Sequence, residues 1–366
     1  MRFVQSFLLL FIFLTQPVFA SKQPFNIEKL AGNLGVVWGM DFVDADRIIF
    51  TQREGRVGLL DLSNNRVTWI SGVPEVHAEG QGGLLDVAIP PNYAETGWIY
   101  FTYSKPDLLQ AQTTLARAKL QKTSLIDWQD LLVSDSASFR NIHFGSRIAF
   151  DGKGHVFFSI GDRGERSNAQ NLTNHAGSVI RLNMDGSVPK DNPFVGNSKA
   201  RDEIWSYGHR NPQGLYYDQK TDRLWEIEHG PQGGDEINLI QKGKNYGWPI
   251  VSQGKEYFSS TDVGVKHKQG MEEPVKVYIP SIAPCDLMVY HGREFPDWES
   301  NLLTGALKLQ HLNRITLNGQ LLAIGEHRYL QDLHQRIRSL AVDVTGRIYV
   351  GTDSGNIYRL TSPSRH

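Results

Sequence analysis

The residue types best suited to chemistry gather between Glu226 and Pro249, in the stretch EIEHGPQGGDEINLIQKGKNYGWP. His229, Asp235 and Glu236 stand there among several glycines, which allow a backbone to adopt positive φ and to approach a ligand closely. Carboxylates and backbone carbonyls are the oxygen ligands that Ca²⁺ prefers. The stretch therefore predicts a cation or cofactor site, with a long surface loop of good turn chemistry as the alternative.

Three further turns place polar side chains just before apolar segments. Gln81 lies between glycines in HAEGQGGLL, and its amide both donates and accepts hydrogen bonds. His143 lies in NIHFG, where an imidazole is suited to act as a general base near neutral pH. Arg210 and Asn211 lie in YGHRNPQG, where a guanidinium can hold a carboxylate through two hydrogen bonds. The alternatives are a glycine-rich turn, a structural histidine and a surface arginine.

Basic side chains recur near the C-terminus. Lys308 ends the segment GALK, and Arg336 and Arg338 lie in QRIR at the start of an apolar run. Side chains alternate along a strand, so Arg336 and Arg338 should share one side of it. With Lys308 they would form an anion-binding cluster. The alternative is a set of edge-strand charges that discourage aggregation.

The first 20 residues are predicted to be a secretory signal peptide. Arg2 precedes the apolar run Phe7–Leu14, and small residues precede the expected cleavage point after Ala20. The run is too short to span a bilayer, although an uncleaved anchor is the alternative. We therefore expect a periplasmic protein with no membrane insertion after cleavage, and one mature domain over residues 21–366.

Composition excludes some classes of function. The chain has 366 residues, of which 40% are hydrophobic and 21% charged, which is ordinary for a globular protein. Its formal net charge of −1 gives no electrostatic basis for binding nucleic acid. Cys285 is the only cysteine, so no internal disulfide can form, and we expect it to be a small buried hydrophobe.

A degenerate strand–turn–strand unit recurs along the chain. The expected first strands are Val37–Phe42, Leu84–Ile89, Arg147–Phe150, Gly214–Tyr217, Leu287–Tyr290 and Ile337–Val342. The expected second strands are Arg47–Thr51, Trp98–Tyr103, His155–Ile160, Arg223–Glu228, Asn301–Gly305 and Arg347–Thr352. Third strands are expected at Val57–Leu60, Val179–Asn183, Ile237–Ile240, Ile315–Leu317 and Ile357–Leu360. Such a repeat is typical of an all-β, six-bladed β-propeller with antiparallel four-stranded blades. Two stacked β-sandwich domains are the alternative, but no linker divides the chain.

Several long motifs occur in the order found in one known family. They are GQGGLLDVAIPPNY, HFGSRIAFDGKGHVFFSIGDRG, NMDGSVPKDNPF, EIWSYGHRNPQGL, EHGPQGGDEINLIQKGKNYGWP, GALK and QRIR. Over nearly the whole mature chain, the sequence resembles the soluble aldose sugar dehydrogenases that use pyrroloquinoline quinone (PQQ), relatives of soluble quinoprotein glucose dehydrogenase. The resemblance implies that PQQ lies over the axis of a six-bladed propeller and that Ca²⁺ binds against it.

The resemblance also implies roles for individual residues. His143 would remove the proton from the C1 hydroxyl of an aldose, and hydride would pass from C1 to C5 of PQQ. PQQ would contact Gln81, Arg210, Asn211, Tyr257, Ala306, Leu307, Lys308, Arg336, Ile337 and Arg338. The carbonyls of Gly230 and Pro231 would bind the Ca²⁺ beside PQQ, while Asp235, Glu236 and Tyr246 would surround a second, structural Ca²⁺. Electrons would pass to an external acceptor.

One departure from the family pattern bears on the mechanism. In the glucose dehydrogenase branch an acidic residue precedes the catalytic histidine, whereas this chain has Ile142 there, so the group that orients His143 is left open. Shorter substrate loops favour broad aldose specificity in a monomer or homodimer. The alternatives are a metal-dependent hydrolase of the lactonase type, also on a six-bladed propeller, and a non-catalytic periplasmic binding propeller. Lys308, Arg336 and Arg338 argue against the hydrolase, because like charges would repel its metal.

Overall fold

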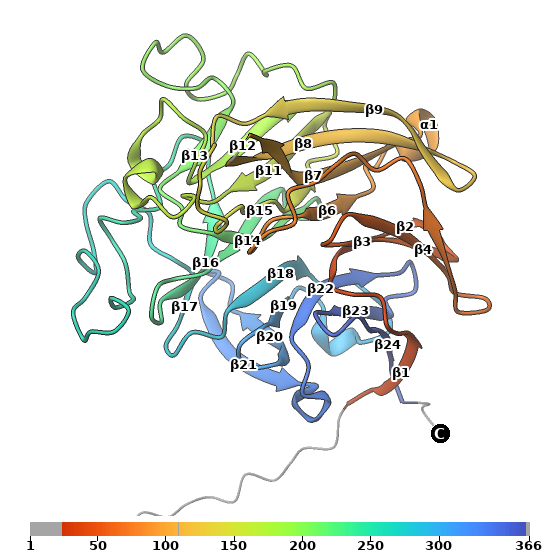
Figure 1. Cartoon of the computed structure of the whole chain (residues 1–366). Helices are drawn as coiled ribbons and strands as arrows, with labels where there is room; N and C mark the ends of the chain where they lie inside the picture. Colours follow the sequence, from red (N-terminus) through yellow and green to blue (C-terminus); the bar gives the residue numbers. More distant parts are fainter. Residues whose placement is uncertain (1–23, 109, 364–366) are drawn as a thin grey trace, which may run out of the picture.

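Six antiparallel sheets of four strands each surround a single axis (Figure 1). The computed structural model describes residues 24–108 and 110–363, and the predicted signal peptide lies outside these residues. The all-β, six-bladed propeller expected from the repeat is confirmed. Within the described part of the chain, no helix has the length and apolar character needed to cross a membrane.

Blades one to five each consist of four consecutive strands. Blades one and two contain β2 (Val37–Asp44), β3 (Arg47–Gln52), β4 (Arg56–Asp61), β5 (Arg66–Ile70), β6 (Leu84–Ala88), β7 (Trp98–Asp107), β8 (Gln110–Gln121) and β9 (Ser124–Val133). Blades three and four contain β10 (Ile148–Phe150), β11 (His155–Ile160), β12 (Ser178–Asn183), β13 (Ile204–Tyr207), β14 (Pro212–Asp218), β15 (Arg223–Glu228), β16 (Asp235–Ile240) and β17 (Lys276–Tyr278). Blade five contains β18 (Pro284–Val289), β19 (Leu302–Ala306), β20 (His311–Leu317) and β21 (Ala323–Tyr329).

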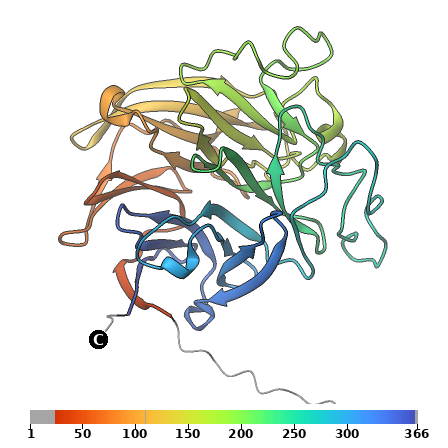
Figure 2. The same ribbon diagram turned by 180° about the vertical axis from the view of Figure 1, so that it is seen from behind.

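The sixth blade closes the ring with strands from both ends of the chain. It contains β22 (Ile337–Val342), β23 (Ile348–Thr352) and β24 (Ile357–Thr361), and β1 (Asn26–Ala31) pairs with β24 as the outermost strand. Helical structure among the described residues is short: α1 (Tyr93–Thr96) and three 3₁₀ turns at Arg166–Gln170, Pro296–Trp298 and Gln331–Leu333. Between β16 and β17 a long segment without strands extends from the side of the ring (Figures 1 and 2).

The first strand of each blade lies next to the axis. β2, β6, β10, β14, β18 and β22 pack against one another, and each has mostly buried residues. They enter the ring from the same end, so the loops that precede them gather at that end of the axis. The structure thus brings together residues that are widely separated in the sequence.

Arg147 ties these six inner strands together. Its guanidinium donates to Gln213 O at 3.0 Å, Trp38 O at 3.1 Å, Arg338 O at 2.7 Å and Asp86 Oδ1 at 3.0 Å, and lies 3.5 Å from Cys285 Sγ. These partners come from the other five blades, and the Arg147 side chain is only 3% exposed. Cys285 is fully buried, as the sequence predicts. Removing a buried, fully bonded charge of this kind is strongly destabilising, because its partners lose their compensation.

The strand predictions fail mainly for the outer strands. In the second unit no third strand was predicted, yet β8 is the longest strand described in the structure. Its sequence QAQTTLARAKLQ has three alanines and only two leucines among polar residues, which gives a weak β signal. The predicted inner strands begin or end within a few residues of the observed ones; for example, β10 begins at Ile148 rather than at Arg147.

Candidate active site

The predicted site residues lie where the inner strands begin. Gln81 precedes β6, His143 precedes β10, Arg210 and Asn211 precede β14, and Arg336 precedes β22. Because these strands enter the ring from one end, the loops bring the side chains to one end of the axis. Two adjoining cavities there, of about 170 and 500 Å³, share Gln81 and His229 in their walls.

A buried carboxylate orients His143. The imidazole Nδ1 lies 2.6 Å from Asp162 Oδ1, and His143 and Asp162 are 9% and 1% exposed. Asp162 also accepts hydrogen bonds from Gly164 N at 2.7 Å and from Trp248 Nε1 at 2.8 Å. These donors fix the carboxylate, so it can in turn fix the ring. Asp162 is therefore the group that orients His143 in this chain, where Ile142 precedes the histidine.

The hairpin register explains why Asp162 meets His143. β10 and β11 are antiparallel, and Ile148 pairs with Phe158. Residues before β10 therefore lie beside residues after β11. His143 has a positive φ of 56°, and its N–H donates to Gln81 Oε1 at 2.8 Å, which holds the turn in place. Asp162 lies in the motif that ends in GDRG, but its residue type alone did not predict a role for it.

The protonation of this pair suits a general base. Burial, with the positive charges of Arg210 and Arg163 adding to it, lowers the pKa of His143 below its usual value despite the hydrogen bond to Asp162. Burial alone would favour the neutral acid of Asp162, but the hydrogen bond from His143 and that from Gly164 lower its pKa overall. At neutral pH the ring is therefore neutral and Asp162 is ionised. Since the carboxylate only accepts, Nδ1 holds the proton and Nε2 is free to accept one.

Arg210 links several walls of the larger cavity. Its guanidinium donates to His229 O at 3.0 Å and lies 3.3 Å from the Tyr257 hydroxyl. It also lies over the ring of Trp248, 5.3 Å from the ring centroid. Tyr257 is 51% exposed, so it forms part of the rim, whereas Asn211 is 1% exposed and lines the smaller cavity. Burial lowers the pKa of His229 to about 3, so this ring is neutral as well.

The arginines predicted to share one side of a strand share one carboxylate. Arg336 Nε and Arg338 Nε each lie 2.7 Å from an oxygen of Asp353, which the sequence analysis did not single out. Arg336, Arg338, Asp353 and Leu307 line the smaller cavity, and Lys308 lines the larger one. Two guanidiniums on one carboxylate leave a net positive charge. Ala306, the last residue of β19, and Ile337, the first residue of β22, are buried beside them.

The glycine-rich stretch between Glu226 and Pro249 borders the larger cavity with Gly230 and Pro231. A Cβ on Gly230 would lie 2.2 Å from Gly234 O, so only glycine fits there. Asp235 is bonded within the loop. Its two oxygens accept from Gly230 N, Ser281 Oγ, Ile282 N and Ala283 N at 2.7–3.0 Å. Asp235 therefore shapes the loop, and a Ca²⁺ beside it stays a prediction.

Glu236 and Tyr246 lie away from the cavity walls. The Tyr246 hydroxyl donates to Leu239 O at 2.7 Å and accepts from Gln241 N at 2.8 Å, so its backbone carbonyl is the group left for an ion. Burial, with the charges of Glu228 and Glu273 adding to it, raises the pKa of Glu236 well above its usual value. A cation would offset this clustering of acids. A structural Ca²⁺ at Glu236 and Tyr246 stays a prediction.

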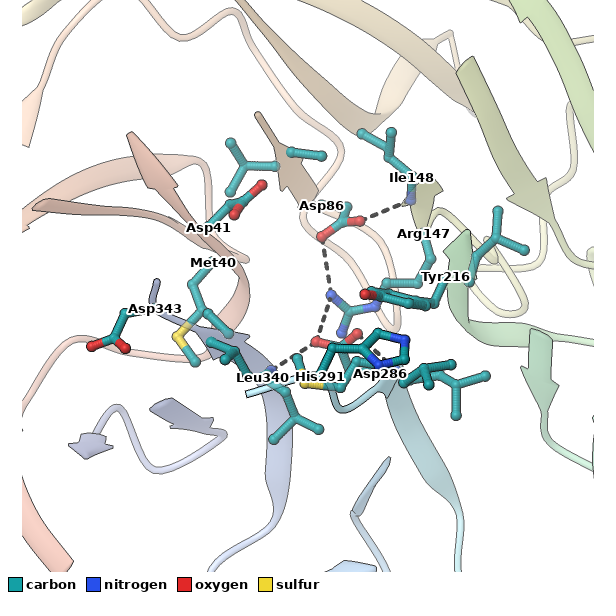
Figure 3. Close-up of a pocket in the computed structure, with 18 of the residues that line it drawn as sticks. Met40, Asp41, Asp86, Arg147, Ile148, Tyr216, Asp286, His291, Leu340 and Asp343 are labelled. Carbon is teal, nitrogen blue, oxygen red and sulfur yellow. Dashed lines mark hydrogen bonds and ion pairs between the residues drawn. The ribbon is translucent and has the colours of Figure 1, made fainter. Parts of the chain in front are cut away.

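A cavity of about 550 Å³ occupies the opposite end of the axis (Figure 3). It is lined along the later parts of the inner strands, and its charged residues include Asp41, Asp86 and Asp286. Arg147 lies between this cavity and the predicted site, where it bonds Asp86 and lies 3.6 Å from Asp286. Burial raises the pKa of Asp41 to about 7. The acidic lining makes this end unsuited to a polyanion, whereas the first end is cationic.

The site thus combines a buried His–Asp pair, cationic walls and a glycine-rich turn at one end of the axis of a propeller. Comparisons with known proteins make the assignment specific. The family model for glucose/sorbosone dehydrogenases matches residues 34–359, and the chain belongs to this family. The predicted resemblance and the predicted class, an oxidoreductase of this family, are thereby confirmed.

Named relatives agree with the family model. The chain is 37% identical to the aldose sugar dehydrogenase of Escherichia coli (strain K12), over 98% of both chains. It is 32% identical to quinoprotein glucose dehydrogenase B of Acinetobacter calcoaceticus, over 83% of this chain and 80% of that one. The crystal structure of the apo form of the soluble Escherichia coli aldose sugar dehydrogenase matches with a TM-score of 0.88 and 36% identity, over 93% of this chain and all of that one.

Proposed function

We propose that the protein oxidises aldose sugars at C1 to the lactone, with PQQ and Ca²⁺ as cofactors and an external electron acceptor. Family membership and the names of the relatives support this proposal. One observation carries it: the buried His143–Asp162 pair faces a cavity that adjoins the cationic group of Arg336, Arg338 and Lys308. A base next to an anion-binding pocket is what an alcohol oxidation with an anionic quinone requires.

The donor set fits PQQ, which has three carboxylates. Burial of such an anion requires cationic or hydrogen-bonding partners. Lys308, Arg336, Arg338 and Arg210 supply positive charge at the cavities, and Gln81 and Asn211 supply amides. The residues that would hold PQQ are Gln81, Arg210, Asn211, Tyr257, Ala306, Leu307, Lys308, Arg336, Ile337 and Arg338. The carbonyls of Gly230 and Pro231 would hold Ca²⁺, and oxygen ligands of this type suit that ion.

When bound, PQQ supplies a hydride acceptor, and Ca²⁺ polarises its quinone oxygen as a Lewis acid. The protein supplies the base. His143 Nε2 accepts the proton of the sugar C1 hydroxyl, which leaves the ring doubly protonated. Asp162, 2.6 Å from Nδ1, stabilises this imidazolium while it stays ionised itself. The hydrogen bond from the His143 N–H to Gln81 keeps the ring at the cavity during turnover.

Residues at the rim would orient the sugar. Arg210 and Tyr257 contact each other at the edge of the larger cavity, and Phe258 beside them is fully exposed. Exposed aromatic rings next to polar groups suit the mixed apolar and hydroxylated faces of a sugar. The open rim places few polar groups at fixed positions, which favours broad aldose specificity. We expect the protein to act in the periplasm after cleavage of residues 1–20, as a monomer or homodimer.

The lactonase-type alternative lacks its metal ligands at this end of the axis. The one side-chain carboxylate among the residues that line the two site cavities is Asp353, and Arg336 and Arg338 hold it. A hydrolytic metal would need several carboxylate or amide oxygens converging on the axis.

Reconstitution tests the proposed reaction. Apo protein supplied with PQQ and Ca²⁺ should reduce an artificial dye when an aldose is added, and omission of PQQ should abolish the signal. If PQQ binds but no aldose supports dye reduction, the dehydrogenase proposal is wrong. Activity that persists without PQQ would also contradict it.

Cofactor affinity tests the cationic group separately. Arg338→Ala should raise the Kd for PQQ about 10- to 100-fold, because a hydrogen bond to a charged group contributes about 1.5–3 kcal/mol. Arg336 is half exposed, so Arg336→Ala should have a smaller effect. Arg66→Ala removes an exposed charge on the outer strand β5 and serves as the control. Equal PQQ affinity in Arg338→Ala and Arg66→Ala would exclude the anion-binding role.

A further inference from the structure

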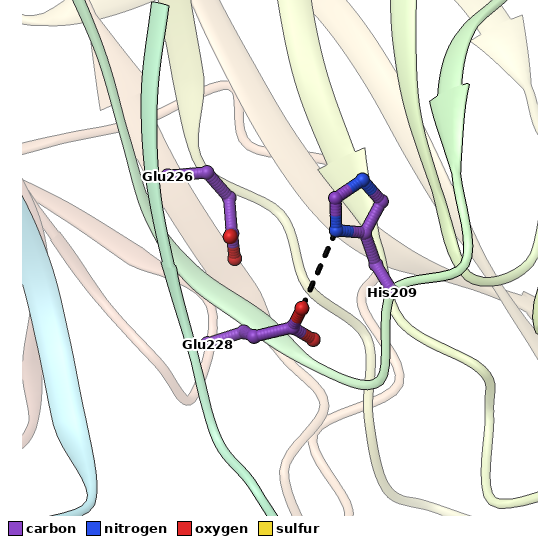
Figure 4. A group of neighbouring side chains, drawn as sticks. All are labelled: His209, Glu226 and Glu228. Carbon is purple, nitrogen blue, oxygen red and sulfur yellow. Dashed lines mark hydrogen bonds and ion pairs between the residues drawn. The ribbon is translucent and has the colours of Figure 1, made fainter. Parts of the chain in front are cut away.

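A second buried group of histidine and carboxylates lies on blade four and the loop that leads into it. It consists of His209 in that loop and of Glu226 and Glu228 on β15 (Figure 4). Their exposures are 0%, 0% and 5%. One imidazole nitrogen of His209 and one carboxylate oxygen from each glutamate lie within 4.8 Å of one another. Figure 4 shows the imidazole and both carboxylates turned toward a common point.

The spacing of these atoms suits a shared ion better than a hydrogen bond. His209 Nδ1 lies 3.4 Å from Glu228 Oε1. A charge-assisted hydrogen bond between nitrogen and a carboxylate is about 2.7–2.9 Å long. Two ligands that each lie about 2.0–2.1 Å from a tetrahedral zinc ion are about 3.3–3.4 Å apart. The His209–Glu228 separation matches the second geometry, and the other two pairs of ligand atoms lie within 4.8 Å.

A buried oxygen of Glu226 has no partner among the described residues. Glu226 Oε2 accepts from Asn238 Nδ2 at 2.9 Å, but Glu226 Oε1 has no hydrogen bond. A buried polar group without a partner costs about 1–3 kcal/mol, and more when it is charged. A cation at the common point would satisfy this oxygen. The unpartnered Glu226 oxygen therefore supports a bound cation independently of the short distances between the three side chains.

The surrounding contacts orient the three side chains as ligands. His209 Nε2 lies 2.9 Å from Ser206 Oγ, so Ser206 can accept the Nε2 proton and leave Nδ1 bare. The His209 ring also stacks on Tyr246, with 4.8 Å between centroids. Glu228 Oε2 accepts from Arg210 N at 2.5 Å and from Asn211 N at 3.2 Å, which leaves Oε1 facing His209. Metal-binding histidines and carboxylates are characteristically held by such outer contacts.

We propose that His209 Nδ1, Glu226 and Glu228 bind a divalent transition-metal ion of the zinc class. An imidazole ligand favours zinc over Ca²⁺, which takes six to eight oxygens. The site adjoins the Ca²⁺ site expected at Glu236–Tyr246, because Glu236 pairs with Glu228 across β15 and β16 and the Tyr246 ring stacks on His209. It differs from that site in its imidazole ligand, so the choice between zinc and Ca²⁺ decides the proposal. Because Glu228 also holds the backbone of Arg210 and Asn211, the ion would fasten β15 to the loop that carries these two residues. Its role is structural.

Metal content of the refolded full-length protein tests the proposal. Wild-type protein is unfolded with a chelator, refolded with Zn²⁺ or with Ca²⁺ alone, desalted, and analysed by elemental mass spectrometry and thermal melting. We expect one zinc per chain and a higher Tm after refolding with Zn²⁺, because a ligand that binds only the folded state stabilises it. Glu226→Gln keeps the shape of the side chain and should weaken zinc binding about 100-fold or more.

His175→Gln is the matched control. His175 is also buried and lies 3.3 Å from Glu203, but its Nδ1 accepts from Asp135 N and it has no second carboxylate. This variant should keep its zinc. No zinc in wild-type protein refolded with Zn²⁺, or equal zinc in wild-type and Glu226→Gln protein, would overturn the proposal.

A measurement on the wild type alone covers the case in which Glu226→Gln does not fold. Co²⁺ replaces Zn²⁺ in tetrahedral sites and gives visible absorption bands there that differ from those of the aqueous ion. Refolding with Co²⁺ should produce these bands in one equivalent, and added Zn²⁺ should abolish them. A spectrum identical to that of aqueous Co²⁺ would overturn the proposal.

Discussion

Two buried histidines, His143 and His209, each face a carboxylate through Nδ1, but the two pairs differ in distance and access. In the first pair Nδ1 lies 2.6 Å from Asp162, and the residue borders the larger cavity of the site. In the second pair Nδ1 lies 3.4 Å from Glu228, a second carboxylate lies nearby, and the ring is fully buried. The first arrangement shares one proton and leaves Nε2 open to substrate.

The difference shows that a His–carboxylate pair does not define a function by itself. Asp162 has donors on both oxygens, so it orients one ring and leaves room for nothing else. Glu226 has an oxygen without a partner, and the nearby nitrogen lies too far from Glu228 for a strong hydrogen bond. The two sites therefore differ in whether both carboxylate oxygens accept hydrogen bonds, a condition that we call saturation. A saturated carboxylate suits a proton-transfer pair, and an unsaturated one suits a metal site.

The largest expected effect comes from removing the base that borders the larger cavity. His143→Ala should lower kcat about 10²–10⁴-fold while PQQ still binds, because general-base catalysis contributes about that much. Steady-state kinetics with saturating PQQ and a separate PQQ titration measure the two properties. Wild-type turnover in this variant would show that His143 is not the base. The proposed functional difference between His143 and His209 would then be wrong.

The next effect tests the role of the orienting carboxylate. Asp162→Asn keeps the shape of the side chain, but its amide can donate to Nδ1 and so stabilise the wrong tautomer of His143. We expect kcat to fall about 100-fold or more, with little change in KM, as for other buried carboxylates that hold a catalytic imidazole. If kcat is unchanged, Asp162 only packs against the ring.

The pH dependence of the wild type follows from the same pair. His143 must be neutral to accept a proton, and its pKa is lowered chiefly by burial. The neutral form therefore persists below the usual pKa of about 6.5 for histidine. The acid limb of kcat/KM should have its half-point below that value, and activity should be lost as the pH falls through it. A half-point above 7 would contradict the protonation assigned to the pair.

The second pair should affect stability more than chemistry. Glu228→Gln weakens two charge-assisted hydrogen bonds, from the backbone N–H groups of Arg210 and Asn211. We expect the free energy of unfolding to fall by about 2 kcal/mol. Denaturant unfolding measures this change. Glu203→Gln alters a half-buried partner of His175 and should cost less than about 1 kcal/mol. Equal losses would show that Glu228 has no special role.

The sequence predicted the fold better than the contacts of the site. Asp151–Gly154 is a clear turn between two apolar runs, and β10 and β11 flank it as expected. β8, the third strand of blade two, escaped prediction because alanine and polar residues dominate it.

The site shows the same limit. His143, Arg336 and Arg338 were found because their residue types suggest chemistry. Asp162 was missed because its partner is set by the register of a hairpin and not by neighbouring letters. Asp235, an acidic residue of the type that binds cations, accepts hydrogen bonds from its own loop and from the segment before blade five, which its residue type alone did not predict. The residue type shows which interactions a side chain can make. Only the folded structure shows which of these interactions it makes.

The smallest effect tests whether saturation of Asp162 matters. Trp248→Phe keeps an aromatic ring, which is 5% exposed, but removes the 2.8 Å hydrogen bond to Asp162 Oδ2. One hydrogen bond contributes about 0.5–1.5 kcal/mol, so we expect kcat to fall about 2- to 10-fold. The freed oxygen makes Asp162 a stronger partner for the imidazolium, so the half-point of the acid limb should move to higher pH.

The two readouts distinguish orientation from packing. If Trp248 only fills space, Phe should preserve both kcat and the pH profile, because the remaining ring can occupy the same position. If it completes the hydrogen-bond set of Asp162, kcat and the half-point should change together, and Trp69→Phe on the outer strand β5 should change neither. A drop in kcat without a shift in the half-point would mean that the indole positions substrate, and saturation of the carboxylate would then no longer explain how His143 differs from His209.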